Sequence, residues 1–130
     1  MATAVTILED HKGITSPRVS GDEYFVDILV DLGAYPTADG VGLLVNAADC
    51  GLSTIHQVMV TGQDTFTALV VPEVLSTGSY TSNTGSSAGD ATASTTSFVL
   101  NVLHEASNQI AEHTGTTDYG NVRCRVYGLL

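Results

Sequence analysis

Arg123 and Arg125 are spaced to present two guanidinium groups on the same side of a β-strand. Residues 121–127 read NVRCRVY, so valine and cysteine alternate with the arginines. Side chains two positions apart on a strand share a face, which separates the arginines from the apolar residues. A guanidinium group can bind a carboxylate through two parallel hydrogen bonds. The pair is therefore a candidate contact with carboxylates of a partner protein.

The same arginines have a second possible use inside the subunit. Residues 24–31 read YFVDILVD, which also alternates and places Asp27 and Asp31 on one face of another expected strand. Ion pairs between the two strands would neutralise Arg123 and Arg125 without any partner. The sequence leaves both uses open.

Two pairs of neighbouring carboxylates raise the question of a hydrolytic site. Glu9-Asp10 and Asp22-Glu23 both flank expected turns. A glycosidase needs its two acids several ångströms apart across a cleft, whereas these are sequence neighbours. We therefore expect these carboxylates to be solvated.

Histidines near carboxylates raise the question of a metal site. His104-Glu105 and Glu112-His113 carry groups that can bind zinc, but their spacing fits no short zinc motif, and we expect surface residues. The chain also contains no phosphate loop, nucleophile elbow or Cys-x-x-Cys motif. We expect no catalytic residues, no cofactor and no metal.

The cysteines, Cys50 and Cys124, are too few for a disulfide framework. Both occupy positions where a small apolar residue would serve, which predicts buried thiols. The alternative is a single bridge between them, which synthesis in a reducing cytosol disfavours.

Seven short runs rich in β-branched residues indicate an all-β fold. They span residues 4–8, 24–30, 41–45, 54–60, 65–71, 97–103 and 122–126. Strands at this spacing in a chain of 130 residues are typical of a single-domain β-sandwich or jelly-roll-like barrel covering residues 1–130. The Gly62-Gln63-Asp64 turn predicts that runs 54–60 and 65–71 form a hairpin.

Helical structure is expected only as one or two short turns. In NAADCGL, Asn46 can cap a single turn and Gly51 can close it with a positive φ. Apolar residues recur at helical spacing in Val102–His113, although Ser107 and Asn108 could also form a turn inside a strand pair. The structure of Val102–His113 therefore stays open.

Ser76–Ser97 is a long Ser/Thr/Gly stretch whose one large apolar side chain is Tyr80. Alone it buries too little surface to offset its ordering entropy, which predicts a mobile loop that neighbouring subunits hold in place. A β-hairpin extension is the alternative. In either form Tyr80 joins the two arginines as a candidate partner contact.

Charge and hydropathy narrow the classes of partner. The formal net charge is -10 and only 14% of residues are charged. A chain this acidic repels phosphate backbones and anionic membranes, so we expect neither nucleic-acid nor membrane binding. The opening MATAVTIL lacks a basic n-region and a long apolar run, which predicts synthesis in a cytosol.

Three stretches resemble a family of small virion proteins of tailed bacteriophages. They are TAVTILED at 3–10, AYPTADGVGLLVNAADCGLSTI at 34–55 and IAEHTGTTDYGNVRCRVYGL at 110–129, in the family's order. Residues 76–97 depart from the family's pattern. The resemblance implies a non-enzymatic capsid decoration (cement) protein on the capsid surface of the virion, made in the host cytoplasm. It also implies that the protein binds the major capsid protein.

Such a protein stabilises the assembled head best when each unit touches several capsid subunits. We therefore expect a homo-oligomer, either a dimer or a trimer. The alternative function is a phage tail or receptor-binding accessory module that recognises host glycan. Aromatic residues, which commonly form glycan platforms, make up only 6% of the chain with no tryptophan, and this disfavours the alternative.

Overall fold

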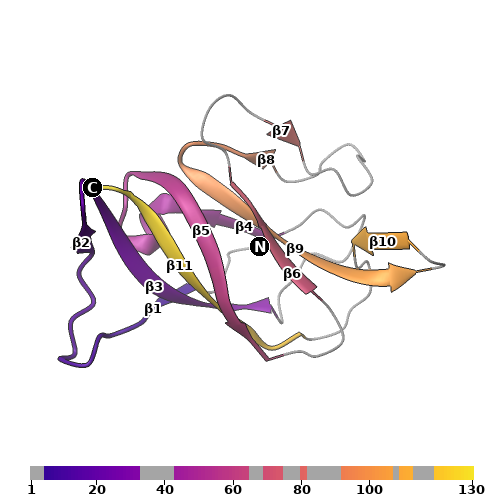
Figure 1. The fold of residues 1–130 in the computed structure, drawn as a ribbon, viewed down its shortest axis with the longest axis horizontal. Coiled ribbons are helices and arrows are strands. Elements are labelled where there is room, and N and C mark those ends of the chain that lie inside the picture. Colours follow the sequence, from indigo (N-terminus) through magenta and orange to yellow (C-terminus); the bar gives the residue numbers. More distant parts are fainter. Residues whose placement is uncertain are drawn as a thin grey trace.

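Figure 1 shows a computed structural model, in which the described residues form mainly β-strands, with a short 3-10 turn at Ala47–Cys50. It describes residues 5–32, 43–64, 69–74, 80–81, 92–106, 109–112 and 119–130. The strands are β1 (Val5–Ile7), β2 (Arg18–Ser20), β3 (Glu23–Asp31), β4 (Leu43–Asn46), β5 (Thr54–Gln63), β6 (Leu69–Glu73), β7 (Tyr80–Thr81), β8 (Thr92–Ala93), β9 (Ser97–Ala106), β10 (Gln109–Glu112) and β11 (Asn121–Leu129). The expected all-β fold is confirmed.

The first sheet has the C-terminal strand in its interior. β11 pairs antiparallel with β3 on one side and with β5 on the other. β3 in turn pairs on its far edge with the short strands β2 and β1, each of which covers one end of it. The apolar alternation of residues 121–127 is thus explained by a strand whose Val and Cys side chains line the core.

The second sheet is built around β9 in the same way. β6 lies along one edge, while β4 and β10 follow one another along the opposite edge. Val102–Ala106 is therefore strand, and with β10 it forms the strand pair that the sequence left open. No helix among the described residues has the length and apolar character needed to span a membrane.

The predicted hairpin between 54–60 and 65–71 is wrong. β5 pairs with β11 in the first sheet, and β6 pairs with β9 in the second. Both strands have the expected alternation, but alternation fixes which face is buried and does not select the partner strand. β5 and β6 therefore belong to different sheets.

One apolar core fills the space between the sheets. It takes Ile28 and Val126 from the first sheet and Phe98 and Leu100 from the second, all almost fully buried. The 3-10 turn η2 (Ala47–Cys50) lies at the edge of this core and ends at Gly51, whose φ is 75°. Asn46 stands at the N-cap as predicted, although its side chain makes no capping hydrogen bond.

A small third sheet pairs Tyr80–Thr81 with Thr92–Ala93. β8 leads into β9, and Ala93 is buried against Val99 on the face of the second sheet that points away from the main core. Most of the Ser76–Ser97 segment, 76–79 and 82–91, lies outside the described residues. The pairing of its two ends agrees with the hairpin alternative.

Candidate functional site

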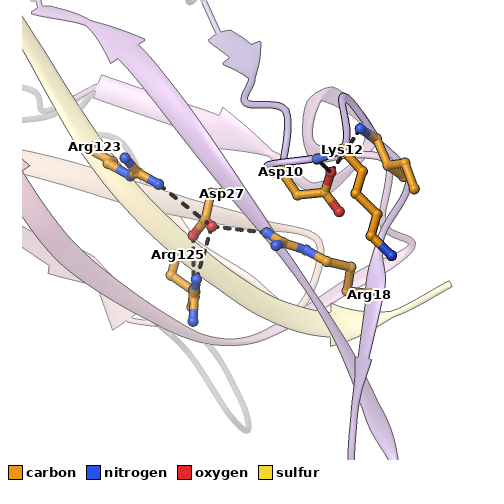
Figure 2. A network of polar contacts seen from close by, with 7 residues as sticks. Asp10, Lys12, Arg18, Asp27, Arg123 and Arg125 are labelled. Atoms are coloured by element: carbon orange, nitrogen blue, oxygen red, sulfur yellow. Dashed lines mark hydrogen bonds and ion pairs between the residues drawn. The ribbon is translucent and has the colours of Figure 1, made fainter.

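All three arginines of the chain converge on one carboxylate, that of Asp27. Asp27 lies on β3, Arg123 and Arg125 on β11, and Arg18 on β2. The side chains meet on the face of the first sheet that points away from the core (Figure 2).

Strand register explains this convergence. Arg125 is the direct cross-strand partner of Asp27, and Arg123 is paired with Leu29, one step along the same face. The hairpin formed by β2 and β3 positions Arg18. Ser20 pairs with Glu23, and Arg18 therefore lies opposite Phe25. Gly21 has a φ of 65°, as a two-residue hairpin turn requires.

The contacts to Asp27 differ between the arginines. Arg125 donates through Nε to Oδ1 at 2.8 Å and through Nη2 to Oδ2 at 2.9 Å, the bidentate geometry of a guanidinium–carboxylate pair. Arg18 donates through Nη2 to Oδ2 at 2.9 Å. The Nη2 of Arg123 stands 3.8 Å from Oδ2, beyond hydrogen-bond distance.

Burial distinguishes the acid from its partners. The Asp27 side chain is only 7% exposed, whereas those of Arg18, Arg125 and Arg123 are 33%, 36% and 53% exposed. The hydrogen bonds from Arg125 lower the pKa of Asp27 below its usual value, against the opposing effect of burial. The same bonds raise the pKa of Arg125. Asp27 is therefore ionised at neutral pH.

An aromatic pair supports the arginines. The ring centroids of Phe25 and Tyr127, which are cross-strand partners, lie 5.8 Å apart. The guanidinium carbons of Arg18 and Arg125 each lie 4.6 Å from the centroid of Phe25. Cation–π attraction and the shared carboxylate thus hold these two guanidinium groups in place.

Beside the cluster is an open hollow of about 350 Å³, lined by Asp27, Thr61, Arg123 and Arg125. The β5–β11 register shifts between Arg123, paired with Gly62, and Cys124, paired with Val60. Thr61 is thus the additional residue of a β-bulge, and its hydroxyl donates to the Arg123 carbonyl oxygen at 3.2 Å. Together these side chains form what we call the arginine site: Arg18, Asp27, Thr61, Arg123 and Arg125.

The sequence predicted part of this site. The internal ion pair between the β11 arginines and Asp27 is confirmed, with Arg125 as the bonded partner. Asp31 lies two positions beyond Leu29 on the same face of β3 and is the cross-strand partner of Asn121. Tyr80 lies on β7, but its side chain is outside the described part of the chain.

Arg18 was missed as a member of the site. Asp22-Glu23 was expected to flank a turn, but the three residues of β2 before this turn are too few to show an alternating pattern. A two-residue turn fixes hairpin register, so pairing Ser20 with Glu23 would have placed Arg18 beside Asp27.

The other groups considered in the sequence have local roles. The Oδ1 atom of Asp10 accepts hydrogen bonds from the backbone N–H groups of Lys12 and Ile14. Glu23 is paired with His56 at 3.1 Å. Among the described residues no group of three or more His, Cys, Asp or Glu side chains could hold a metal ion. His113 and the side chains of His104, Glu105 and Glu112 lie outside the described part of the structure.

Cys50 and Cys124 are free thiols and fully buried, as predicted. Burial raises the pKa of each to about 12. Thiols with such a pKa carry almost no thiolate at neutral pH and are poor nucleophiles.

Comparison with protein families, with curated proteins and with solved structures finds no match for this chain.

Proposed function

We propose that the protein is a structural protein of a tailed bacteriophage virion, a capsid decoration protein that binds the major capsid protein and stabilises the assembled head. The observation that carries this proposal is the arginine site on the outward face of the first sheet. Three arginines and one aspartate give it a formal charge of +2, on a chain whose net charge is -10. A local reversal of charge on an acidic protein favours one orientation of docking on an acidic partner.

The class of partner comes from the resemblance of residues 3–10, 34–55 and 110–129 to phage virion proteins. These stretches contain β1, the β4–η2 corner and β11. β1 and η2 are neighbours, since a Cβ atom on Gly51 would lie 3.9 Å from the side chain of Ile7. The backbone N–H of Ser53, in the second stretch, donates to the carbonyl oxygen of Leu129 in the third at 2.8 Å, so the described parts of the three stretches are connected.

The mechanism is stabilisation by mass action. A protein that binds only the assembled lattice adds its binding free energy to that state and raises the barrier to its disruption. Contacts from one oligomer to several capsid subunits multiply this effect, because later contacts form at high effective concentration. We propose a dimer or trimer, which sedimentation at micromolar concentration would detect. A monomer both in solution and on the particle would remove the multivalent mechanism.

The test uses heads made without this protein. They should assemble with normal geometry and release their genome at a lower temperature than complete heads, as followed by a DNA-binding dye. Adding purified wild-type protein should restore the release temperature.

Matched charge reversals sharpen this test. Arg123→Glu should weaken rescue, because its side chain is the most exposed of the three arginines and is not hydrogen-bonded to Asp27. Lys12→Glu makes the same change of charge on the neighbouring loop, outside the hollow, and should rescue like wild type (Figure 2). Heads of normal stability that adsorb poorly to host cells would instead support the glycan-binding alternative and overturn the proposal.

A further inference from the structure

We propose that the hollow of the arginine site binds a carboxylate side chain, Asp or Glu, of a partner protein. The inference rests on the proposed function only for the identity of that partner.

Arg123 and Arg125 retain hydrogen-bond donors for such a ligand. A guanidinium group has five N–H donors. Arg125 directs Nε and Nη2 to Asp27 and also interacts with the Tyr127 side chain, so part of its donor capacity is already used. Arg123 reaches Asp27 only at 3.8 Å and makes no side-chain hydrogen bond to the described residues. Both side chains line the hollow.

Charge balance at the site favours a second anion. Asp27 is one buried carboxylate shared by three guanidinium groups. The guanidinium groups repel one another, and an arriving carboxylate would reduce the formal charge from +2 to +1. The positive charge that Asp27 leaves unbalanced therefore attracts an anionic group to the site.

The site is also pre-ordered. Asp27 and the Phe25 ring hold the Arg125 guanidinium group in place. The hydroxyl of Thr61 donates to the backbone carbonyl oxygen of Arg123, which links β5 to the part of β11 that carries the Arg123 side chain. A ligand therefore meets Arg125 already oriented, which lowers the entropic cost of binding.

The surroundings favour a protein carboxylate over a phosphate. Met59 is the cross-strand partner of Arg125 on β5 and is 45% exposed, so an apolar surface borders the cationic one. A polypeptide segment with an apolar residue beside its acidic residue matches both surfaces. The net charge of -10 also repels polyanions such as nucleic acid more strongly than a single carboxylate.

The test follows the arginine side chains by NMR. The chain has three arginines, so the Nε–H region of a proton–nitrogen spectrum should contain three cross-peaks, assignable with single variants. The titrant is a blocked tripeptide, glycine-glutamate-leucine, and the control is the same peptide with glutamine. We expect the glutamate peptide to move the Arg123 peak saturably at millimolar concentration and the glutamine peptide to leave it in place.

Variants and a second anion separate the outcomes. The glutamate peptide should also move the Arg125 peak. That shift should disappear in the Arg123→Gln variant and remain in the Lys12→Gln variant. Backbone spectra would confirm that both variants are folded. No saturable shift, an equal shift with the glutamine peptide, or binding of inorganic phosphate without binding of the peptide would each overturn the proposal. Peptide binding with no stabilisation of heads would instead refute the proposed function and leave the carboxylate site standing.

Discussion

Replacing Asp27 with asparagine should destabilise the protein strongly, because the change removes the one negative charge that holds three guanidinium groups together. The structure shows three hydrogen bonds from arginine to this carboxylate, two from Arg125 and one from Arg18. A hydrogen bond to a charged group contributes roughly 1.5–3 kcal/mol. The arginine side chains are 33–53% exposed, so water can form hydrogen bonds with them in place of some of those lost with Asp27.

We therefore expect Asp27→Asn to lower the free energy of unfolding by about 3 kcal/mol, well below the sum of the three bonds. In a domain of this size such a loss lowers the melting temperature by roughly 10 °C. The matched control is Asp22→Asn, which removes the same charge from an exposed turn and should change the unfolding free energy by less than about 0.5 kcal/mol.

The destabilisation caused by Asp27→Asn should become smaller at low pH. The pKa of Asp27 is lowered in the folded protein relative to the usual value of 3.8. Its contribution is therefore fully present above that value and is lost as the pH falls through the lower, folded pKa. The stability difference between wild type and Asp27→Asn should be constant from pH 7 to about pH 5 and shrink below about pH 4.

Thermal unfolding followed by circular dichroism at a series of pH values measures both quantities. If Asp27→Asn melts at the temperature of Asp22→Asn, or if its deficit is unchanged at pH 3, then the arginine cluster does not stabilise the fold as argued.

Further predictions concern the packing of the first sheet. Gly128→Ala should lower the free energy of unfolding by roughly several kcal/mol or prevent soluble expression, because a Cβ atom there would overlap a β5 carbonyl oxygen. Gly62→Ala is the control in the same strand pair. Its Cβ atom would meet open space, so denaturant titration should show an almost unchanged stability. Cys50 and Cys124, with a pKa of about 12, should resist a thiol reagent until denaturant is added; rapid native labelling would contradict their burial. Deleting Asn121–Leu130 should abolish cooperative unfolding, and a truncated chain with a sharp thermal transition would refute this.

Much of the fold could be predicted because burial leaves a direct signal in the sequence. β11 was recognised from the alternation of Val122, Cys124 and Val126, which are fully buried. The turn that ends at Gly51 was recognised because glycine readily adopts a positive φ. Both signals are local.

Strand partners could not be read in the same way. The hairpin assigned to 54–60 and 65–71 failed because the hydrophobic pattern says nothing about which strand lies alongside. β2 and β10 are three and four residues long, too short for a clear period. Arg18 was overlooked for that reason, whereas an ion pair between Asp27 and the β11 arginines was one of the two uses that the sequence left open.

The interior position of β11 has a consequence for how the protein reaches its folded state during synthesis. Arg125 and Asp27 are direct neighbours in the sheet and 98 residues apart in the chain, and β11 lies between β3 and β5 in the strand order. The first sheet therefore cannot be completed until residues 121–129 have left the ribosome. Contacts between such distant segments also make folding slow, because a long loop must close before they form. Nascent chains should stay sensitive to protease until that strand emerges, and they should then become protected together.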